Sequence, residues 1–204
     1  PELQELRSVL LPGNKPRLLL NKNLSRTQKA FILGREIGFQ FMKITERPNT
    51  TSWVELDSFE QVLNNFKGSY FSCALLLNRQ ELVRRLEVLF SDPKFNSQEI
   101  VKIMDDFGVS PEIFTQRMTS LLPRYFGIQE LFFLRFSNKN GSEEFDLTKE
   151  MHLAGLHNPH ANMMNEHYCR RWVSINILRD LTVQLKKGGY YKPLCLAQRS
   201  RYFV

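Results

Sequence analysis

The chain has 204 residues, of which 42% are hydrophobic and 12% aromatic, and a formal net charge of +7. This composition can bury a sizeable core and excludes a disordered chain. No apolar run reaches the roughly 18 residues that a membrane-spanning helix needs, so we expect no membrane partner and a cytoplasmic location. The three cysteines form no CxxC pair, which suits a reducing compartment.

Basic residues are concentrated in the last fifth of the chain. Residues 166–204 hold eight Lys or Arg and two acidic residues, so this segment carries most of the positive surplus. Such a segment can attract nucleic acid or an anionic ligand, and it can equally be the solvated face of a long helix. Direct nucleic-acid binding through this segment is therefore one functional hypothesis.

The first predicted elements are a short helical start, a strand and a long helix. The apolar run at 17–20, bounded by Pro and Asn, is typical of a buried strand. Asn23 or Ser25 can cap a helix that extends to Met42. Apolar residues recur along it at helical spacing and predict its core-facing side: Ala30, Leu33, Ile37 and Phe41.

Part of this helix, from Phe31 to Phe39, reads as a zinc-peptidase HExxH helix that lacks its metal ligands. In that motif two histidines four residues apart bind zinc, and the Glu activates the metal-bound water. Here Arg35 and Phe39 take the histidine places; a guanidinium repels a dication, and a phenyl ring has no lone pair. Glu36 alone is kept, as a catalytic relic. Taken by itself, the pair of residues 35 and 36 is also compatible with an ordinary polar spot on an amphipathic helix.

A loop is predicted at 44–52 and a second helix from about 58 to 77, in which Cys73 is expected to be a packed core thiol. From 97 to 126 the pattern predicts two helices joined by a short turn. Ser110 suits the N-cap of the second helix, and Pro111 suits its first position.

This helix pair has the form of a helix-turn-helix, the motif in which a second helix reads DNA. Residues 97–125 carry three basic and four acidic groups, which argues against strong contact with phosphates. The candidate DNA contacts are Thr115, Gln116 and Arg117, and the alternative is a purely structural helix pair.

The remaining elements are two strands and a helix. Residues 131–136 form an aromatic-rich strand, Asn140 and Gly141 predict a hairpin turn, and residues 145–153 alternate with period two. A long helix is predicted from about 166 to 187, ended by two glycines.

All four histidines of the chain fall within sixteen residues, close to a cysteine and two arginines. Imidazole and thiolate suit zinc, although the spacing matches no established zinc pattern. The cluster can instead be a hydrogen-bonded structural loop or the lining of a pocket for an anionic ligand. The weak metal candidates are His157, His160, His167 and Cys169, and the neighbouring ligand candidates are Arg170 and Arg171.

In this order the segments from about 10 to 127 resemble the ImmA/IrrE family of peptidase-like domains, which are often fused behind an Xre-type helix-turn-helix in bacterial transcriptional regulators. The frame of the family motif is kept by Gln28, Phe31, Gly34, Glu36, Ile37 and Gly38. The third metal ligand of the family, a Glu, falls on Asn65. All three ligand positions therefore depart from the family pattern.

The resemblance implies a mostly helical α+β fold in three parts. Residues 1–95 would be a degenerate zinc-peptidase-like domain with a zincin-like strand and helix, 96–127 a helix-turn-helix-like unit, and 128–204 the start of a sensor-like α/β module. The predicted function is the effector-sensing or oligomerisation part of an Xre-family regulator rather than an enzyme. We expect no cofactor, although zinc is not excluded.

The expected partners are DNA, bound mainly by a helix-turn-helix that precedes this piece, a small anionic effector, and a second copy in a homodimer. The candidate ligand-binding residues are Arg35, Glu36, Asn65, His157, His160, His167, Arg170 and Arg171. Arg35 is the first candidate for binding an anion, and the alternative is an internal salt bridge to a nearby acid. The rival hypothesis is a metal-dependent hydrolase that uses Glu36 with a metal displaced to the histidines.

Overall fold

The computed structural model describes residues 6–47, 58–94, 96–129, 131–137 and 146–152, together with Asp180 and Val183. The chain forms two compact units, Pro1–Gln129 and Glu130–Val204. The described elements are five helices and two antiparallel hairpins, which confirms the predicted α+β, mostly helical class. The expected parts 1–95 and 96–127 both lie within the first unit. None of the described helices is long and apolar enough to cross a membrane.

The described part of the first unit begins with a hairpin, where a helical start was predicted. Strand β1, Ser8–Leu11, pairs antiparallel with β2, Arg17–Leu20, and Ser8 lies opposite Leu20. The expectation of a helix was wrong because these two short apolar runs pair with each other. Strand β2 is also not buried: Leu19 is 40% exposed, since a two-stranded sheet leaves one face open to water.

Helix α1, Arg26–Phe41, begins where the capping residues predict. The Oγ of Ser25 accepts from the Gln28 backbone N–H at 3.2 Å, and the Gln28 side chain accepts from the Ser25 N–H at 2.9 Å. This capping box satisfies two backbone donors that the helix start leaves open. Helix α2, Phe59–Leu76, begins at the N-cap Ser58 and confirms the second predicted helix.

The core-facing side of α1 differs from the prediction. The apolar stripe Leu33, Ile37 and Phe41 is 46%, 53% and 76% exposed. The buried residues of α1 are instead Ile32, Gly34, Gly38 and Phe39. The prediction was wrong because it took the larger apolar residues as the packing face, whereas α1 packs through its glycines.

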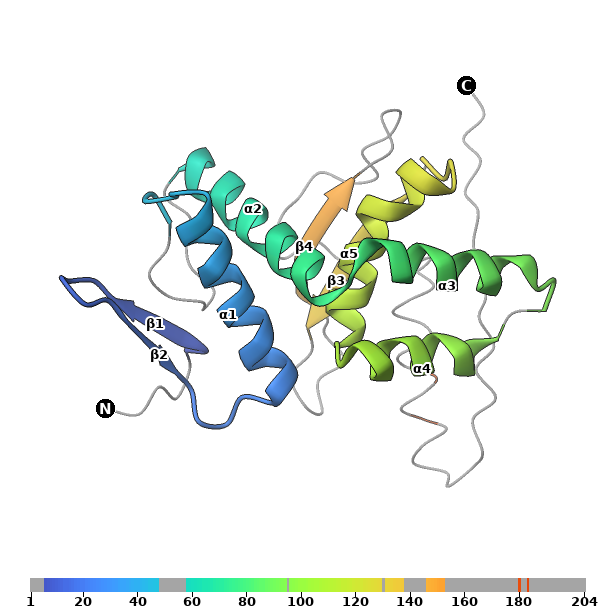
Figure 1. Ribbon diagram of the computed structural model, residues 1–204, viewed down its shortest axis with the longest axis horizontal. Helices are drawn as coiled ribbons and strands as arrows, with labels where there is room; N and C mark the ends of the chain where they lie inside the picture. The colour runs from blue at the N-terminus through green and yellow to red at the C-terminus, as the bar shows by residue number, and fades with distance from the viewer. Residues whose placement is uncertain are drawn as a thin grey trace. The chain divides into compact units, whose positions relative to one another are not determined.

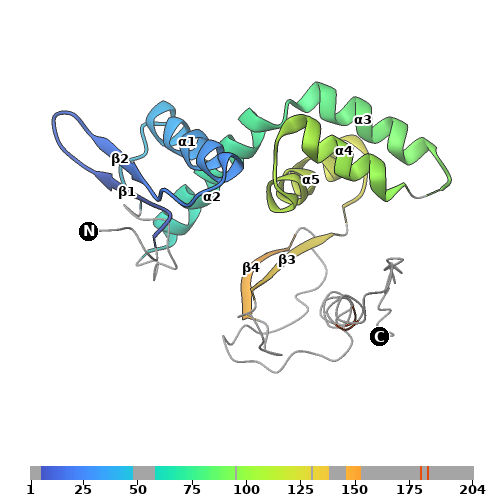
Figure 2. The ribbon, with the colours of Figure 1, turned by 90° about the horizontal axis from the view of Figure 1, so that it is seen from below.

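Helices α1 and α2 run side by side, with the β1–β2 hairpin next to α1 (Figures 1 and 2). A Cβ at Gly34 would lie 2.5 Å from Ser72 Oγ, and a Cβ at Gly68 would lie 2.5 Å from the ring of Phe39. The same hydroxyl of Ser72 donates to the carbonyl of Phe31 at 2.8 Å. The close approach of the two helices therefore depends on positions that have no side chain.

Three further helices complete the first unit: α3, Arg79–Ser91, α4, Ser97–Phe107, and α5, Pro111–Tyr125. Helix α3 was not predicted. The turn before α5 matches the expectation, with Gly108 left-handed at φ 61° and Ser110 as N-cap. The buried core lies between α2 and these helices, and its members include Cys73, Leu77, Leu82, Leu86, Ile103, Ile113, Phe114 and Leu121. Cys73 is 1% exposed, which confirms the packed thiol.

The second unit contains a hairpin of β3, Phe132–Ser137, and β4, Asp146–His152. The strands pair antiparallel, with a register shift between Arg135 and Phe136. This confirms the two predicted strands. The predicted turn at 140–141 lies outside the described residues, as does the predicted helix at 166–187 apart from Asp180 and Val183, which are helical.

The packing of Gly68 against Phe39 leads to a first prediction. Gly68→Ala would ordinarily favour a helix by up to about 1 kcal/mol, but here the added methyl overpacks the ring and we expect a net loss of about 1–3 kcal/mol. The loss is measured as the difference in the free energy of urea unfolding between the variant and the native chain. In a Phe39→Leu background the same change should cost clearly less, because the ring atoms that the methyl meets are gone. An equal cost in both backgrounds would contradict this account.

Candidate functional site

The three positions expected to carry family metal ligands lie together. Arg35 and Phe39 project from α1, and Asn65 projects from the facing side of α2. The Nη2 of Arg35 donates to Asn65 Oδ1 at 2.5 Å, and its guanidinium carbon lies 5.4 Å from the centre of the Phe39 ring. The three positions thus come from two facing helices and contact one another through Arg35.

Glu36 points to a different partner. Both its carboxylate oxygens accept hydrogen bonds from Arg47, at 2.5 and 2.7 Å, and one also accepts from Gln40 at 3.1 Å. The guanidinium of Arg47 also lies 4.6 Å from the centre of the Phe39 ring. Such a two-pronged contact between guanidinium and carboxylate is strong and directional, so the expected general base is held in an ion pair.

We call Arg35, Glu36, Phe39, Arg47 and Asn65 the arginine cluster. Burial lowers the pKa of Arg35 to about 10, and the nearby charge of Arg47 acts in the same direction. Burial by itself would raise the pKa of Glu36, but the hydrogen bonds from Arg47 and Gln40 outweigh it and lower that pKa below its usual value. At neutral pH the cluster therefore holds two cations and one anion.

These residues do not fit a zinc ion. Arg35 places a positive charge at one ligand position and Phe39 offers no lone pair at the second. At the third, the side-chain oxygen of Asn65 already accepts from Arg35. In the described part of the chain no group of three or more His, Cys, Asp or Glu residues gathers that could hold a metal.

The structure also answers what Arg35 contacts. Among the described residues Arg35 donates to the amide of Asn65, while the neighbouring carboxylate of Glu36 pairs with Arg47, so the alternative of a salt bridge from Arg35 to Glu36 is not what this part of the chain shows. The Nε of Arg35 is buried and has no hydrogen-bond acceptor among the described residues. The guanidinium of Arg35 therefore has one N–H that could donate a hydrogen bond to a bound ligand.

The helix-turn-helix candidates do not share an exposed face. Gln116 and Arg117 are 6% and 5% exposed, so neither can reach a base edge from this position. The expectation of DNA contact by these two was wrong because successive residues of a helix point in different directions, and this part of α5 packs inward. Thr115 is exposed, and its hydroxyl donates to the carbonyl of Pro111 at 2.7 Å.

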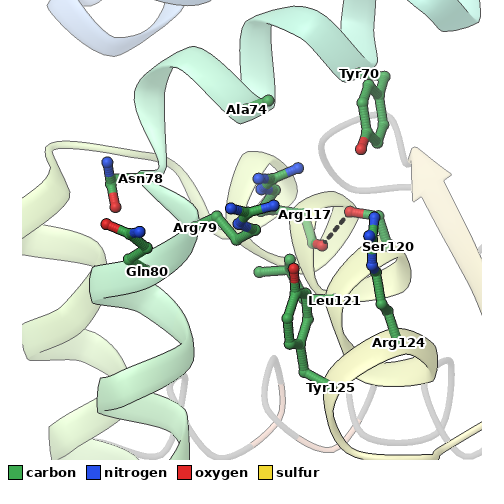
Figure 3. Close-up of a pocket in the computed structure, with 10 residues that line it drawn as sticks. All are labelled: Tyr70, Ala74, Asn78, Arg79, Gln80, Arg117, Ser120, Leu121, Arg124 and Tyr125. Carbon is green, nitrogen blue, oxygen red and sulfur yellow. Dashed lines mark hydrogen bonds between the residues drawn. The ribbon is translucent and has the colours of Figure 1, made fainter.

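The histidine-cluster candidates lie outside the described residues, so their arrangement stays a prediction: His157, His160, His167, Cys169, Arg170 and Arg171. Two further features were not predicted. Arg47 follows α1 at no recognisable spacing from Glu36, so no motif could have identified it. A pocket of about 370 Å³ lies between α2, the start of α3 and α5 (Figure 3).

Residues 3–119 match the sequence profile of the IrrE N-terminal-like domain, Peptidase_M78. Because this match covers more than half of the chain, the chain belongs to that family, which confirms the resemblance. A Mycobacterium tuberculosis transcriptional regulator has a similar fold, with a TM-score of 0.50 and 20% identity over 80% of this chain and 45% of that chain. The chain thus spans less than half the length of that regulator. Comparison with curated proteins gives no match.

The ion pair of Glu36 gives a pH prediction. Because the folded-state pKa of Glu36 is lowered, its contribution to stability is present above the unfolded value near 4.3 and is lost as pH falls through the folded pKa. Glu36→Gln should therefore reduce the free energy of unfolding at pH 7 by about 1–3 kcal/mol. The difference from the native chain should shrink in urea titrations below about pH 4.

The matched control is Glu60→Gln, which removes the exposed pair between Glu60 and Lys67 at 3.9 Å. Exposed pairs contribute little, so this variant should stay close to the native chain at both pH values. A Glu36→Gln effect that does not change with pH would contradict the assignment of the ion pair.

Proposed function

We propose that the chain is the regulatory part of a bacterial transcriptional regulator, built on a peptidase-like domain that does not hydrolyse peptides. The observation that carries the proposal is the arginine cluster. It replaces all three metal-ligand positions and holds Glu36 in an ion pair. A carboxylate paired in this way is a poor general base, because the hydrogen bonds from Arg47 and Gln40 lower its pKa and so disfavour the protonated form that it must reach.

Two further observations support the regulatory role. The chain belongs to the IrrE N-terminal-like family, and its fold is similar to that of a transcriptional regulator. The proposed mechanism is a population shift, in which an effector prefers one arrangement of a homodimer and so changes the DNA affinity of the whole protein. In this proposal DNA binding belongs mainly to a helix-turn-helix outside this chain.

The arginine cluster offers one place for an anionic effector. Arg35 has an unpaired, buried Nε, and the cluster carries one more positive than negative side chain. The ligand candidates Arg35, Glu36 and Asn65 are in contact or adjacent in sequence, so a carboxylate or phosphate entering there would meet a preformed hydrogen-bond network. The histidine cluster remains the second proposed effector site.

The proposed homodimer has a candidate surface on α1. Leu33, Ile37 and Phe41 recur every four residues, so they form one continuous exposed stripe. Scattered exposed apolar residues are ordinary, but a contiguous stripe favours a partner surface. A second copy of the chain is the occupant that the proposed mechanism requires.

Restoring the family ligands tests whether only side-chain chemistry separates this chain from a zinc-binding relative. The variant Arg35→His, Phe39→His, Asn65→Glu should bind about one zinc per chain in a competition titration with a chelator, because the three positions already face one another. The native chain should bind none at this cluster. Zinc bound by the native chain and lost in Glu36→Gln would overturn the proposal, since it would make Glu36 a ligand.

The dimer prediction uses two matched variants. Ile37→Glu and Val101→Glu each place a charge at an apolar position that is about half exposed, on α1 and on α4 respectively. Sedimentation velocity should show weaker self-association for Ile37→Glu only, because a charge buried in an interface without a partner is costly. Equal behaviour of both variants would exclude the α1 stripe as the dimer surface.

A further inference from the structure

The pocket between α2, the start of α3 and α5 has an unusual charge. Three arginines line it from two helices, Arg79 from α3 and Arg117 and Arg124 from α5, and none of the described residues that line it is acidic. Figure 3 shows these side chains extending into the space beneath α2. The rest of the lining is Tyr70, Ala74, Asn78, Gln80, Ser120, Leu121 and Tyr125.

Arg117 is the lining residue whose surroundings most strongly indicate a bound anion. It is 5% exposed, and its buried Nε has no hydrogen-bond acceptor within the described residues. Its guanidinium carbon lies 5.7 Å from the centre of the Tyr70 ring, a cation–π contact that satisfies no hydrogen bond. A buried cation without an anion is unfavourable, because burial removes the water that would solvate its charge, so an anion at this place would be favoured.

The nearby acids of α3 and α4 serve other partners. Glu81 accepts hydrogen bonds from Arg84 and Arg85, and Asp106 accepts one from Arg85 at 2.6 Å. Within the described part of the chain, no salt bridge joins an acid to the three pocket arginines. The positive charge of the pocket is therefore not neutralised by these carboxylates.

The N-terminal end of α3 adds to the positive electrostatic potential of the pocket. Asn78, Arg79 and Gln80 all line the pocket, and they are the N-cap and first two residues of a helix of 13 residues. The N-terminal end of a helix carries partial positive charge and favours anions. The helix end, the exposed arginines and the buried Arg117 thus act on one space.

We propose that this pocket binds the phosphate group of a small molecule. Arg117 would be the inner contact and the exposed Arg79 and Arg124 the outer ones, while Tyr70 and Tyr125 offer flat surfaces to the organic part. A doubly charged phosphate matches several guanidinium groups better than a single carboxylate does. The volume of about 370 Å³ lies in the range of small-molecule sites, and a burial as deep as that of Arg117 excludes the backbone of a nucleic-acid duplex.

This inference goes beyond the proposed function, since none of the pocket residues belongs to the arginine cluster. The proposed function and the phosphate pocket can fail separately. Zinc binding by the Arg35→His, Phe39→His, Asn65→Glu variant does not depend on the pocket, and phosphate binding in the pocket does not depend on Glu36. If both hold, the pocket joins the arginine cluster and the histidine cluster as a candidate effector site.

Isothermal titration with inorganic pyrophosphate, at constant ionic strength, tests the proposal. The native chain should bind about one pyrophosphate, and Arg117→Met should weaken binding at least about tenfold, as expected for loss of a charge-assisted hydrogen bond. Arg84→Met removes the same charge from α3, but Arg84 is exposed and does not line the pocket. It should bind like the native chain.

A second variant covers the case in which Arg117→Met does not fold. Arg79→Met with Arg124→Met changes only exposed lining residues and should also weaken pyrophosphate binding. No binding by the native chain, or equal weakening by Arg84→Met, would overturn the proposal. Unchanged pyrophosphate binding in both the Arg117→Met variant and the Arg79→Met, Arg124→Met double variant would also overturn it. So would displacement of bound pyrophosphate by a short DNA duplex.

Discussion

The close approach of α1 and α2 is the constraint on which the rest of the first unit depends. Gly68 leaves room for the ring of Phe39, and Gly34 leaves room for Ser72, so a side chain of one helix packs directly against the backbone of the other at each place. That contact brings Arg35 against Asn65. The ring of Phe39 then becomes a surface on which two guanidinium groups rest, and the segment after α1 returns to the helix through Arg47.

The forces in this cluster are small beside those of a metal. A cation–π contact contributes roughly 0.5–2 kcal/mol and a hydrogen bond to a charged group about 1.5–3 kcal/mol. A structural zinc site, by contrast, contributes on the order of 10–16 kcal/mol. The helices must therefore be held mainly by apolar burial, which in α1 comes from Ile32 and Phe39 and in α2 from Cys73. The arginine cluster therefore adds a small contribution to a fold that other contacts stabilise.

Local patterns in the sequence were sufficient for much of the fold. Caps such as Ser25, Ser58 and Ser110 fix where helices begin, and the family resemblance pointed to the contact between Arg35 and Asn65. Which side of α1 is buried could not be predicted from the sequence. A hydrophobicity pattern ranks Leu33 above Gly34, but α2 approaches α1 at the glycine, where no side chain stands in the way. Arg47 and the phosphate pocket depend on contacts between distant segments, which spacing along the chain does not encode.

The position of Arg47 limits how this domain can change. Its guanidinium both rests on Phe39 and pairs with Glu36, so the two residues are no longer independent positions. A single change of Phe39 to His would place a third basic group between the two arginines and leave Glu36 paired with Arg47. Each step back toward a metallopeptidase would thus be unfavourable until the others had been made. In the proposed function, this dependence between positions keeps the chain from catalysis together with the residues at the three ligand positions.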